Sequence, residues 1–223
     1  MSLSIIIPTL NEAANLPALL AELAPLQARG AQIIVADGGS TDASRDLLPA
    51  AVEWLDAPRG RARQMNAGAA QASGSVLWFV HADTRLPAEA DQLIEAALAG
   101  GRHCWGRFDL RIDGRPWLLK VVARLISWRS RLTSIATGDQ GIFVLRSHFE
   151  TLGGYADQPL MEDIELCTRL RQLSAPACIG TRLSTSGRRW EQRGVWRTIW
   201  LMWRLRWAYW RGVPAAQLAE AYR

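Results

Sequence analysis

Short apolar runs rich in isoleucine, valine and leucine alternate with segments of helical period through the first hundred residues. Such runs are typical of strands buried in a sheet, and they are expected at residues 4–7, 32–36, 52–55 and 75–80. The intervening helices are expected at residues 13–23, 41–48, 61–72 and 88–98. This alternation with short connections predicts an α/β fold, with a mostly parallel mixed sheet and helices on both faces.

The second half of the chain has a less regular pattern. Residues 105–112 alternate between apolar and polar positions, which predicts an antiparallel strand. A proline begins an amphipathic helix at residues 116–128. Further strands are expected at residues 142–145 and 177–179, and further helices at residues 148–152, 163–173, 194–211 and 214–222. No repeat or linker divides the chain, so residues 1–223 are expected to form a single domain.

The net charge limits the classes of partner that the chain is expected to bind. The net charge is +5, and Lys120 is the single lysine among 26 basic residues. Arginine forms forked contacts with phosphates, so the charge suits an anionic substrate, a nucleic acid or an anionic membrane. No nucleic-acid motif is present, and a nucleic-acid partner is not expected. The glycine spacing of dinucleotide-binding loops and the Walker A motif are also missing, which argues against hydride transfer.

The cysteines and the hydropathy profile indicate a cytoplasmic protein. Cys104, Cys167 and Cys178 form no CxxC pair, so neither a zinc site nor a disulfide framework is expected. The N-terminus enters a strand without a basic leader, so we expect no signal peptide. No apolar run reaches 18 residues, so no membrane-spanning helix is expected.

Polar clusters follow three of the predicted strands, at residues 8–12, 37–42 and 81–84. In open α/β sheets, ligands bind at the carboxyl ends of the strands, so the three clusters predict one binding site. Asp37 can accept a hydrogen bond from an imide such as that of uracil. Asp83 is an oxygen ligand suited to a hard divalent cation that holds a diphosphate.

Six motifs in order, spanning most of the chain, resemble glycosyltransferase family 2, whose members have the GT-A fold. They lie at residues 6–12, 37–42, 60–69, 81–83, 138–141 and 162–163. The resemblance implies a Rossmann-like nucleotide-sugar-binding half at residues 1–100, an acceptor and catalytic half at 101–190, and amphipathic C-terminal helices at 191–223. It also implies inverting transfer of a sugar from a nucleotide-sugar, expected to be a UDP-sugar, to an acceptor hydroxyl with Mn²⁺ or Mg²⁺.

The resemblance also implies a role for each matching residue. Asp163 is expected to be the general base, with Glu162 and Asp139 beside it in the catalytic site, and Asp83 is expected to bind the metal. The expected donor-binding or substrate-binding residues are Pro8, Thr9, Asn11, Glu12, Asp37, Gly38, Gly39, Arg61, Asn66, Gly68, His81, Gln140, Arg189 and Trp190.

Two positions depart from the family pattern. His81 stands where the first aspartate of the DxD motif is usual, so metal binding is expected to depend on Asp83 and the diphosphate. The QxxRW motif is present only as Ser-Gly-Arg-Arg-Trp at residues 186–190, without its glutamine. Residues 138–141 and 211–222 resemble a small bacterial subgroup labelled arsenosugar-biosynthesis glycosyltransferase, a label that does not demonstrate a substrate.

Simpler interpretations remain open for several motifs. The acidic pair Glu162 and Asp163 could only begin a helix, where acids favour the positive end of the dipole. Asp139 and Gln140 lie between two glycines, which also suits a plain tight turn. His81 could support the site without touching a ligand. A non-catalytic nucleotide-sugar-binding protein would carry the same donor residues.

The predicted helix at residues 194–211 carries a stripe of tryptophans. They are Trp196, Trp200, Trp203, Trp207 and Trp210, and arginines at 193, 197, 204 and 211 flank them. Tryptophan beside arginine is typical of a helix at a lipid headgroup layer, which would suit a peripheral membrane enzyme at the inner face with a lipid-linked acceptor. The alternative is a helix whose stripe packs on the core.

Overall fold

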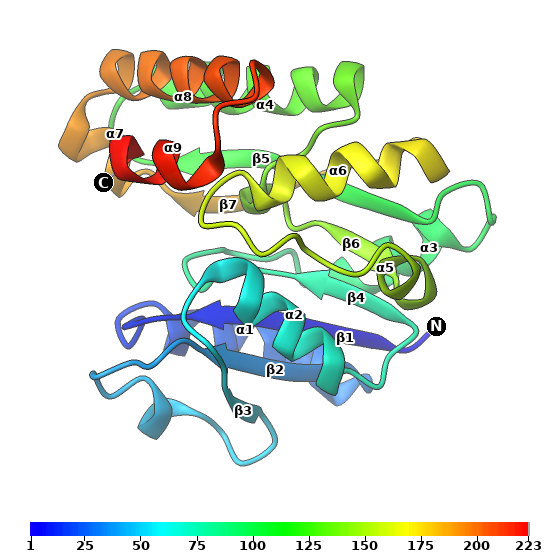
Figure 1. The fold of residues 1–223 in the computed structure, drawn as a ribbon. Coiled ribbons are helices and arrows are strands. Elements are labelled where there is room, and N and C mark those ends of the chain that lie inside the picture. Colours follow the sequence, from blue (N-terminus) through cyan, green and yellow to red (C-terminus); the bar gives the residue numbers. More distant parts are fainter. Residues whose placement is uncertain (223) are drawn as a thin grey trace.

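The computed structural model describes residues 1–222, and it contains a single seven-stranded sheet in the order β3-β2-β1-β4-β6-β5-β7 (Figure 1). The strands are β1 Leu3–Thr9, β2 Gln32–Asp37, β3 Glu53–Asp56, β4 Val76–Phe79, β5 Trp105–Asp113, β6 Phe143–Leu145 and β7 Ala177–Ser186. Only β6 runs antiparallel to its neighbours, β4 and β5. The mostly parallel mixed sheet predicted from the sequence is therefore confirmed.

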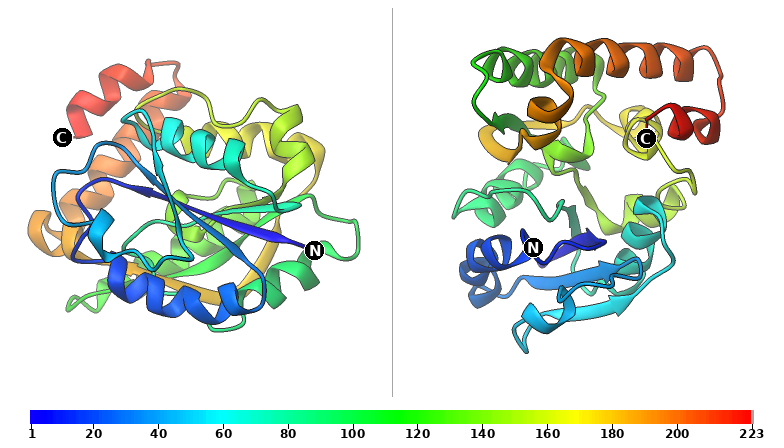
Figure 2. Two further views of the ribbon diagram at one scale, coloured as in Figure 1. Left: turned by 90° about the horizontal axis from the view of Figure 1, so that it is seen from below. Right: turned by 90° about the vertical axis from the view of Figure 1, so that its left-hand side faces the viewer.

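Helices cover both faces of this sheet (Figures 1 and 2). Their bounds are α1 Leu16–Ala28, α2 Arg61–Gln71, α3 Ala90–Leu98, α4 Leu118–Thr133, α5 Arg146–Thr151, α6 Glu162–Leu173, α7 Arg188–Arg193, α8 Val195–Trp210 and α9 Ala215–Tyr222. Two short 3₁₀ helices, η1 Arg45–Leu47 and η2 Gly138–Gln140, lie in the connections. None of the helices described in residues 1–222 is long and apolar enough to cross a membrane.

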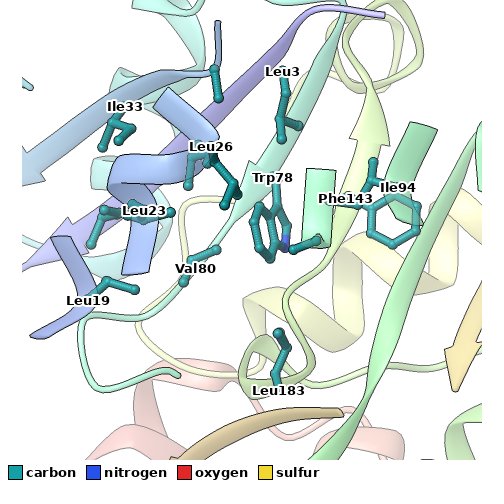
Figure 3. Close-up of a cluster of buried hydrophobic side chains, with 14 of the residues drawn as sticks. Leu3, Leu19, Leu23, Leu26, Ile33, Trp78, Val80, Ile94, Phe143 and Leu183 are labelled. Carbon is teal, nitrogen blue, oxygen red and sulfur yellow. The ribbon is translucent and has the colours of Figure 1, made fainter. Parts of the chain in front are cut away.

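The alternation of side chains along each strand builds a core on each face. Ile5 and Ile7 of β1 point into a cluster covered by α1 and α3, where Trp78 packs (Figure 3). Ile6, between them, points into the opposite cluster, which is covered by α2, α5 and α6. Strands buried on both faces explain the continuous apolar runs in the sequence.

The helix expected at residues 41–48 is wrong, because only the 3₁₀ turn η1 forms there. Asp42 accepts hydrogen bonds from the backbone N–H groups of Ala13 (3.0 Å) and Ser44 (3.0 Å). The Ser44 hydroxyl accepts a further bond from the backbone of Glu12 (3.1 Å). These side chains tie the segment to the loop after β1, in competition with helical hydrogen bonding.

The second half also differs from the sequence-based expectation. The strand expected at residues 177–179 continues to Ser186, because it pairs along nearly the whole of β5. β5 itself is antiparallel to β6 but parallel to β7, so the predicted orientation is only half right. Gly194, with φ of +82°, separates α7 from α8 at the start of the predicted terminal helix.

Candidate active site

The carboxyl ends of β1 and β2 are joined by a buried glutamine. The Gln64 side chain, on α2, donates from Nε2 to the carbonyls of Thr9 (2.6 Å) and Ala36 (2.9 Å). The backbone N–H of Gly38 donates to the same Thr9 carbonyl (2.9 Å). Gln64 lies within a motif that matches the family, but it was not among the predicted site residues, and nothing else in the sequence indicates these hydrogen bonds.

The Asp37 carboxylate is buried in the turn that follows β2. It accepts hydrogen bonds from the backbone N–H groups of Gly39 (2.9 Å) and Ser40 (2.8 Å), and from the Ser40 hydroxyl. Gly39 has φ of +92°, a conformation that glycine adopts at little cost. The bonds of Asp37 therefore shape the turn, and its contact with a uracil remains a prediction.

The loops after β1 and β2 are tied to each other. Asn11 adopts φ of +56°, and its Oδ1 accepts a hydrogen bond from the backbone of Thr41 (2.8 Å). Its own N–H donates to the Ser40 hydroxyl (2.8 Å). Pro8, Thr9 and Glu12 thus share one sheet edge with the turn at residues 37–40, as the strand-end clusters predicted.

Four separate segments bring charged side chains together beside this edge. Arg61, at the start of α2, donates to Glu162 Oε1 (3.1 Å), at the start of α6. His81, after β4, shares a hydrogen bond with Asp139 of η2 (Nδ1 to Oδ1, 3.1 Å). Asp163 Oδ2 accepts a hydrogen bond from the backbone N–H of Gly138 (2.9 Å), which joins the two pairs.

Glycine is required at position 138 because the backbone there lies close to the His81 ring. A Cβ atom at this position would lie 2.7 Å from the His81 ring. The absence of a side chain lets η2 lie against His81 while its backbone N–H reaches Asp163. The segment at residues 138–141 is therefore more than a plain tight turn, because it connects the two acidic residues Asp139 and Asp163.

The surroundings of Asp163 and Asp139 shift the pKa values of their carboxyl groups in opposite directions. Burial, followed by the charge of Glu162, raises the pKa of Asp163 to about 6. Partial burial also acts to raise the pKa of Asp139, but the hydrogen bond to His81 and the positive charges of Arg61 and Arg189 hold it below its ordinary value. Asp163 is thus suited to taking a proton near neutral pH, whereas Asp139 stays ionised.

Asp83 lies in the turn after β4, and its side chain has no hydrogen bond or ion pair within the described part of the chain, residues 1–222. Over the same residues, no group of three or more His, Cys, Asp or Glu side chains could hold a metal ion. A hard cation such as Mg²⁺ is commonly bound by one or two carboxylates together with substrate phosphates. An unpartnered carboxylate fits that arrangement, with a nucleotide diphosphate supplying the remaining ligands.

Comparison with known proteins identifies the family. Residues 4–148, which are more than half of the chain, match the sequence profile described as glycosyl transferase family 2. The chain belongs to glycosyltransferase family 2. This is the family that the ordered motifs implied.

Two curated relatives of the chain come from bacteria. It is 41% identical over 165 residues to a PGL/p-HBAD biosynthesis glycosyltransferase of Mycobacterium tuberculosis, a match that covers 68% of this chain and 62% of the relative. It is 33% identical over 108 residues to the succinoglycan biosynthesis protein ExoA of Rhizobium meliloti, covering 44% of this chain and 33% of that protein. The chain thus spans less than two thirds of the length of these relatives.

Solved structures confirm the GT-A-like fold. Residues 1–349 of Staphylococcus aureus TarS, in complex with UDP, give a TM-score of 0.65 at 16% identity, covering 83% of this chain and 60% of that fragment. Glucosyl-3-phosphoglycerate synthase of M. tuberculosis, in complex with Mn²⁺, UDP and phosphoglyceric acid, gives 0.62 at 20% identity, covering 82% and 69%. At these identities the likeness establishes the fold of the chain alone.

Two side chains that were predicted to bind substrate form hydrogen bonds within the chain instead. Gln140 is fully buried, donates to the Ser130 hydroxyl (3.1 Å) and accepts from the backbone of Thr137 (3.2 Å). Asn66 exchanges two hydrogen bonds with the backbone of Tyr155 (2.8 and 2.9 Å). Direct contact with substrate does not fit the burial of Gln140, and both residues brace loops of the site.

The structure places the two residues of the 186–190 motif in different surroundings. Trp190 packs against the apolar cluster between α4 and β5. Arg189 lies over the ring of Tyr222 (4.1 Å from the guanidinium carbon to the ring centroid). Its charge also acts on Arg61 and Asp139, which puts Arg189 beside the charged cluster. Of the two, Arg189 is the residue that the fold brings to the site.

Gly68 was predicted to bind the nucleotide, but its position indicates a packing role. A Cβ atom there would lie 2.5 Å from the γ2 methyl of Ile6, on the fully buried face of β1. We expect Gly68→Val to lower the free energy of unfolding by about 2–3 kcal/mol through overpacking. Urea denaturation provides the measurement.

Gly180→Val is the matched control, because a Cβ at Gly180 meets no atom within 4 Å. The double variant Ile6→Ala/Gly68→Val should be more stable than the sum of its single changes implies, since the two sites share one contact. If the Gly68→Val protein keeps its stability but loses affinity for UDP, the result would contradict the packing role and support a role of Gly68 in nucleotide binding.

Proposed function

We propose that this family 2 glycosyltransferase transfers a sugar from a UDP-sugar to an acceptor hydroxyl with inversion, and that Asp163 is its general base. The observation that carries the proposal is the state of Asp163, a carboxylate with a pKa of about 6 at the start of α6. It is held in place by a hydrogen bond from the Gly138 backbone. The neighbouring Glu162 pairs with Arg61 and so connects the acceptor half to the nucleotide-binding half.

A single displacement at the anomeric carbon would use both the Asp163 carboxylate and the nearby Arg61 guanidinium. The acceptor oxygen forms a bond to the anomeric carbon while the bond from that carbon to the diphosphate breaks, and the acceptor proton passes to Asp163. The ion pair of Arg61 with the buried Glu162 fixes a guanidinium beside the site, where it can offset charge on the leaving diphosphate. Arg189 adds a second positive charge near Asp139.

A divalent ion, when bound, would supply further neutralisation of the leaving diphosphate. We propose Asp83 as its protein ligand, because the carboxylate follows β4 and has no other partner among residues 1–222. Glucosyl-3-phosphoglycerate synthase, which shares the fold, was crystallised with Mn²⁺ or Mg²⁺ and UDP. His81 would then act through its hydrogen bond to Asp139.

The proposed donor is a UDP-sugar. TarS, with the same fold, was crystallised with UDP and with UDP-GlcNAc. The residues proposed to hold the nucleoside are Thr9, Glu12 and Asp37, which lie at the carboxyl ends of β1 and β2. Gly39 leaves room for a ligand to approach the turn, since a Cβ there meets no atom within 4 Å, whereas a Cβ at Gly38 would lie 3.0 Å from the Gln64 side chain.

The acceptor is less defined than the donor. The relatives reported above carry the names of PGL/p-HBAD and succinoglycan biosynthesis, so the arsenosugar label gains no support from them. A lipid-linked acceptor at the inner face of a membrane is the second candidate. The observation favouring it is that all five tryptophans of α8 lie in solvent.

A thermal-shift series tests the proposal. UDP at about 100 times its dissociation constant stabilises a protein by about 2.7 kcal/mol. For a chain of this size that corresponds to a rise in Tm of roughly 5–10 °C. We expect UDP with Mn²⁺ to give the full rise, UDP alone to give less, and ADP with Mn²⁺ to give little.

Release of UDP from the best donor separates enzyme from binding protein. Stabilisation by UDP-sugars without any UDP release, with or without acceptors, would favour the non-catalytic alternative. Equal shifts with UDP and ADP would contradict the uridine assignment.

A further inference from the structure

The tryptophans of α8 lie on the side of the helix that faces away from the protein. Trp196, Trp200, Trp203, Trp207 and Trp210 are between 60% and 79% exposed. The buried residues of the same helix, Val195, Thr198 and Leu205, lie on its opposite side. The alternative in which the tryptophan stripe packs on the core is therefore wrong.

A second helix repeats this arrangement. Along α4, large apolar side chains recur every three or four residues with exposures between 40% and 71%. They are Trp117, which immediately precedes α4, and Val121, Leu125, Trp128 and Leu132 within it. Leu119 and Val122, on the other side of α4, pack on β5. α4 thus also turns an apolar stripe away from its packed face.

The two stripes belong to one side of the molecule. Val195 and Ile199 of α8 join the cluster formed by Leu119 and Val122 of α4, so both helices pack inward on a shared core. Figures 1 and 2 show the two helices along the same end of the molecule, above β5 and β7. The ten exposed side chains of the two stripes are called the tryptophan surface below.

Both helices are strongly basic. Together they carry seven arginine or lysine residues and no aspartate or glutamate. Arg204 lies over the ring of Trp200 (5.5 Å from guanidinium carbon to centroid), and Arg211 lies over Trp207 (5.2 Å). The arginines thus border the tryptophans and present positive charge at the edge of the surface.

A basic groove adjoins the tryptophan surface beside Trp128. Arg124, Arg131 and Arg182 line it, and Arg131 pairs with Asp109 at 2.8 Å. Arg124 and Arg182 form no ion pair within residues 1–222. Two uncompensated guanidinium groups next to an exposed indole suit a phosphate group at a lipid–water boundary.

We propose that the tryptophan surface docks on an anionic phospholipid bilayer. Tryptophan prefers the headgroup level of a membrane, where its ring is half in the apolar layer and its N–H remains wet. Arginine adds attraction to anionic lipids. A helix lying in the membrane plane with this composition is the form that interfacial anchoring takes.

Docking places the bilayer beside the catalytic cluster. Leu160 and Met161, immediately before Glu162 and Asp163, pack against Leu205 of α8. α4 leads directly into the segment that contains Asp139. The surface and the site therefore share their supports, and a hydroxyl carried by a membrane lipid would reach Asp163 from this side. That last step rests on the proposed function, whereas docking itself does not.

Vesicle sedimentation tests the docking. The whole chain should sediment with phosphatidylcholine vesicles containing about a third phosphatidylglycerol, and much less with phosphatidylcholine alone. Brominated lipid should quench the fluorescence of the wild-type protein, a result that needs no variant. Absence of both signals at low salt overturns the proposal.

Variants assign the binding to the tryptophan surface. Trp200→Gln/Trp203→Gln/Trp207→Gln should weaken binding at least 10-fold, whereas Leu47→Gln/Leu173→Gln, which changes exposed apolar residues elsewhere, should not. Arg197→Gln/Arg204→Gln should weaken binding to anionic vesicles, in contrast to the matched Arg102→Gln/Arg171→Gln. Equal binding by the surface variants and their controls would overturn the assignment.

Two further measurements separate the remaining outcomes. A concentration-dependent dimer that dissociates in the tryptophan variant, with no vesicle binding, would assign the surface to a second copy of the chain and overturn the proposal. Stabilisation by UDP should be equal in the wild type and all these variants. If the wild-type protein binds vesicles but does not bind UDP, the proposed function is contradicted and membrane docking is still supported.

Discussion

Asp163→Asn is expected to lower sugar transfer by at least about 10²-fold, within the range of roughly 10²–10⁴ that a general base contributes. The amide keeps the shape of the side chain, but its single oxygen can accept only one of the two backbone hydrogen bonds that Asp163 receives, from Gly138 and Ile164, and it cannot take the acceptor proton. UDP affinity should change little, so the loss should appear in kcat at saturating donor. Steady-state transfer assays together with UDP titrations provide the measurement.

The pH profile gives an independent readout. Because the pKa of Asp163 is about 6, kcat/KM should rise with pH up to about 6 and then level off. The Asp163→Asn variant should lose this acid limb. A wild-type profile that is flat from pH 5 to 8 would contradict the assignment of Asp163 as base.

The raised pKa of Asp163 also predicts that its contribution to the free energy of unfolding falls as the pH rises, whereas kcat/KM rises. The pKa of Asp163 in the folded protein is about 6, above the value of about 3.9 for an unfolded aspartate. Its contribution to the free energy of unfolding is therefore complete below about pH 4 and is lost as the pH rises through 6. At pH 7.5 this contribution is absent from the wild type, and urea denaturation of Asp163→Asn at that pH separates the cost of the lost backbone hydrogen bond from the loss of activity.

Glu165→Gln is the matched control for Asp163→Asn. Glu165 lies on the first turn of the same helix and pairs with Arg169, away from the charged cluster. Transfer by this variant should stay near the wild-type rate. If Asp163→Asn also transfers normally, Asp139 is the next candidate for the base.

Asp83→Ala is expected to abolish the additional stabilisation that Mn²⁺ gives to the UDP complex, and to reduce metal-dependent transfer to background. The carboxylate has no structural partner in residues 1–222, so its removal should leave the fold intact. A thermal-shift titration with Mn²⁺ at fixed UDP measures the effect. The unliganded Tm of the variant should match that of the wild type.

Asp46→Ala is the control for Asp83→Ala, because Asp46 is an exposed carboxylate in η1, in the connection that follows β2. It should retain the full response to Mn²⁺. An undiminished Mn²⁺ response in Asp83→Ala would remove Asp83 from the metal site.

The buried strands and the strand-end clusters could be predicted because they depend on local pattern. Apolar residues on both faces of β1, such as Ile5 and Ile6, indicate a strand buried in an α/β sheet. The carboxyl ends of parallel strands must share an edge, which brings Asp37 and Asp83 to one side. Pattern and topology together therefore locate the site.

The roles of individual polar residues could not be predicted, because they depend on contacts between distant segments. Gln64, Asn66 and Gln140 carry the same amide chemistry that binds substrates, but each is satisfied by a backbone far away in the sequence. Gly68 likewise matches a family motif, yet it is needed where α2 touches Ile6. A motif identifies such positions without showing which way their side chains point.

The direction of the tryptophan stripe was undecided for a related reason. α8 is apolar on two sides, with Val195 and Leu205 opposite Trp200. A helical period in the sequence shows that a stripe exists, but either stripe could face the core. Only the packing of Leu205 against Met161 decides the matter.

The unbroken hydrogen-bonded ladder from β3 to β7 also limits how the enzyme can move during turnover. β4 pairs with β1 on one side and with β6 on the other, so the residues assigned to the donor and acceptor halves share a single rigid platform. The strand order thus shows no break in the sheet between the two expected halves. If the chain acts as proposed, movements that admit the sugar and release the nucleotide would lie in connections outside the sheet.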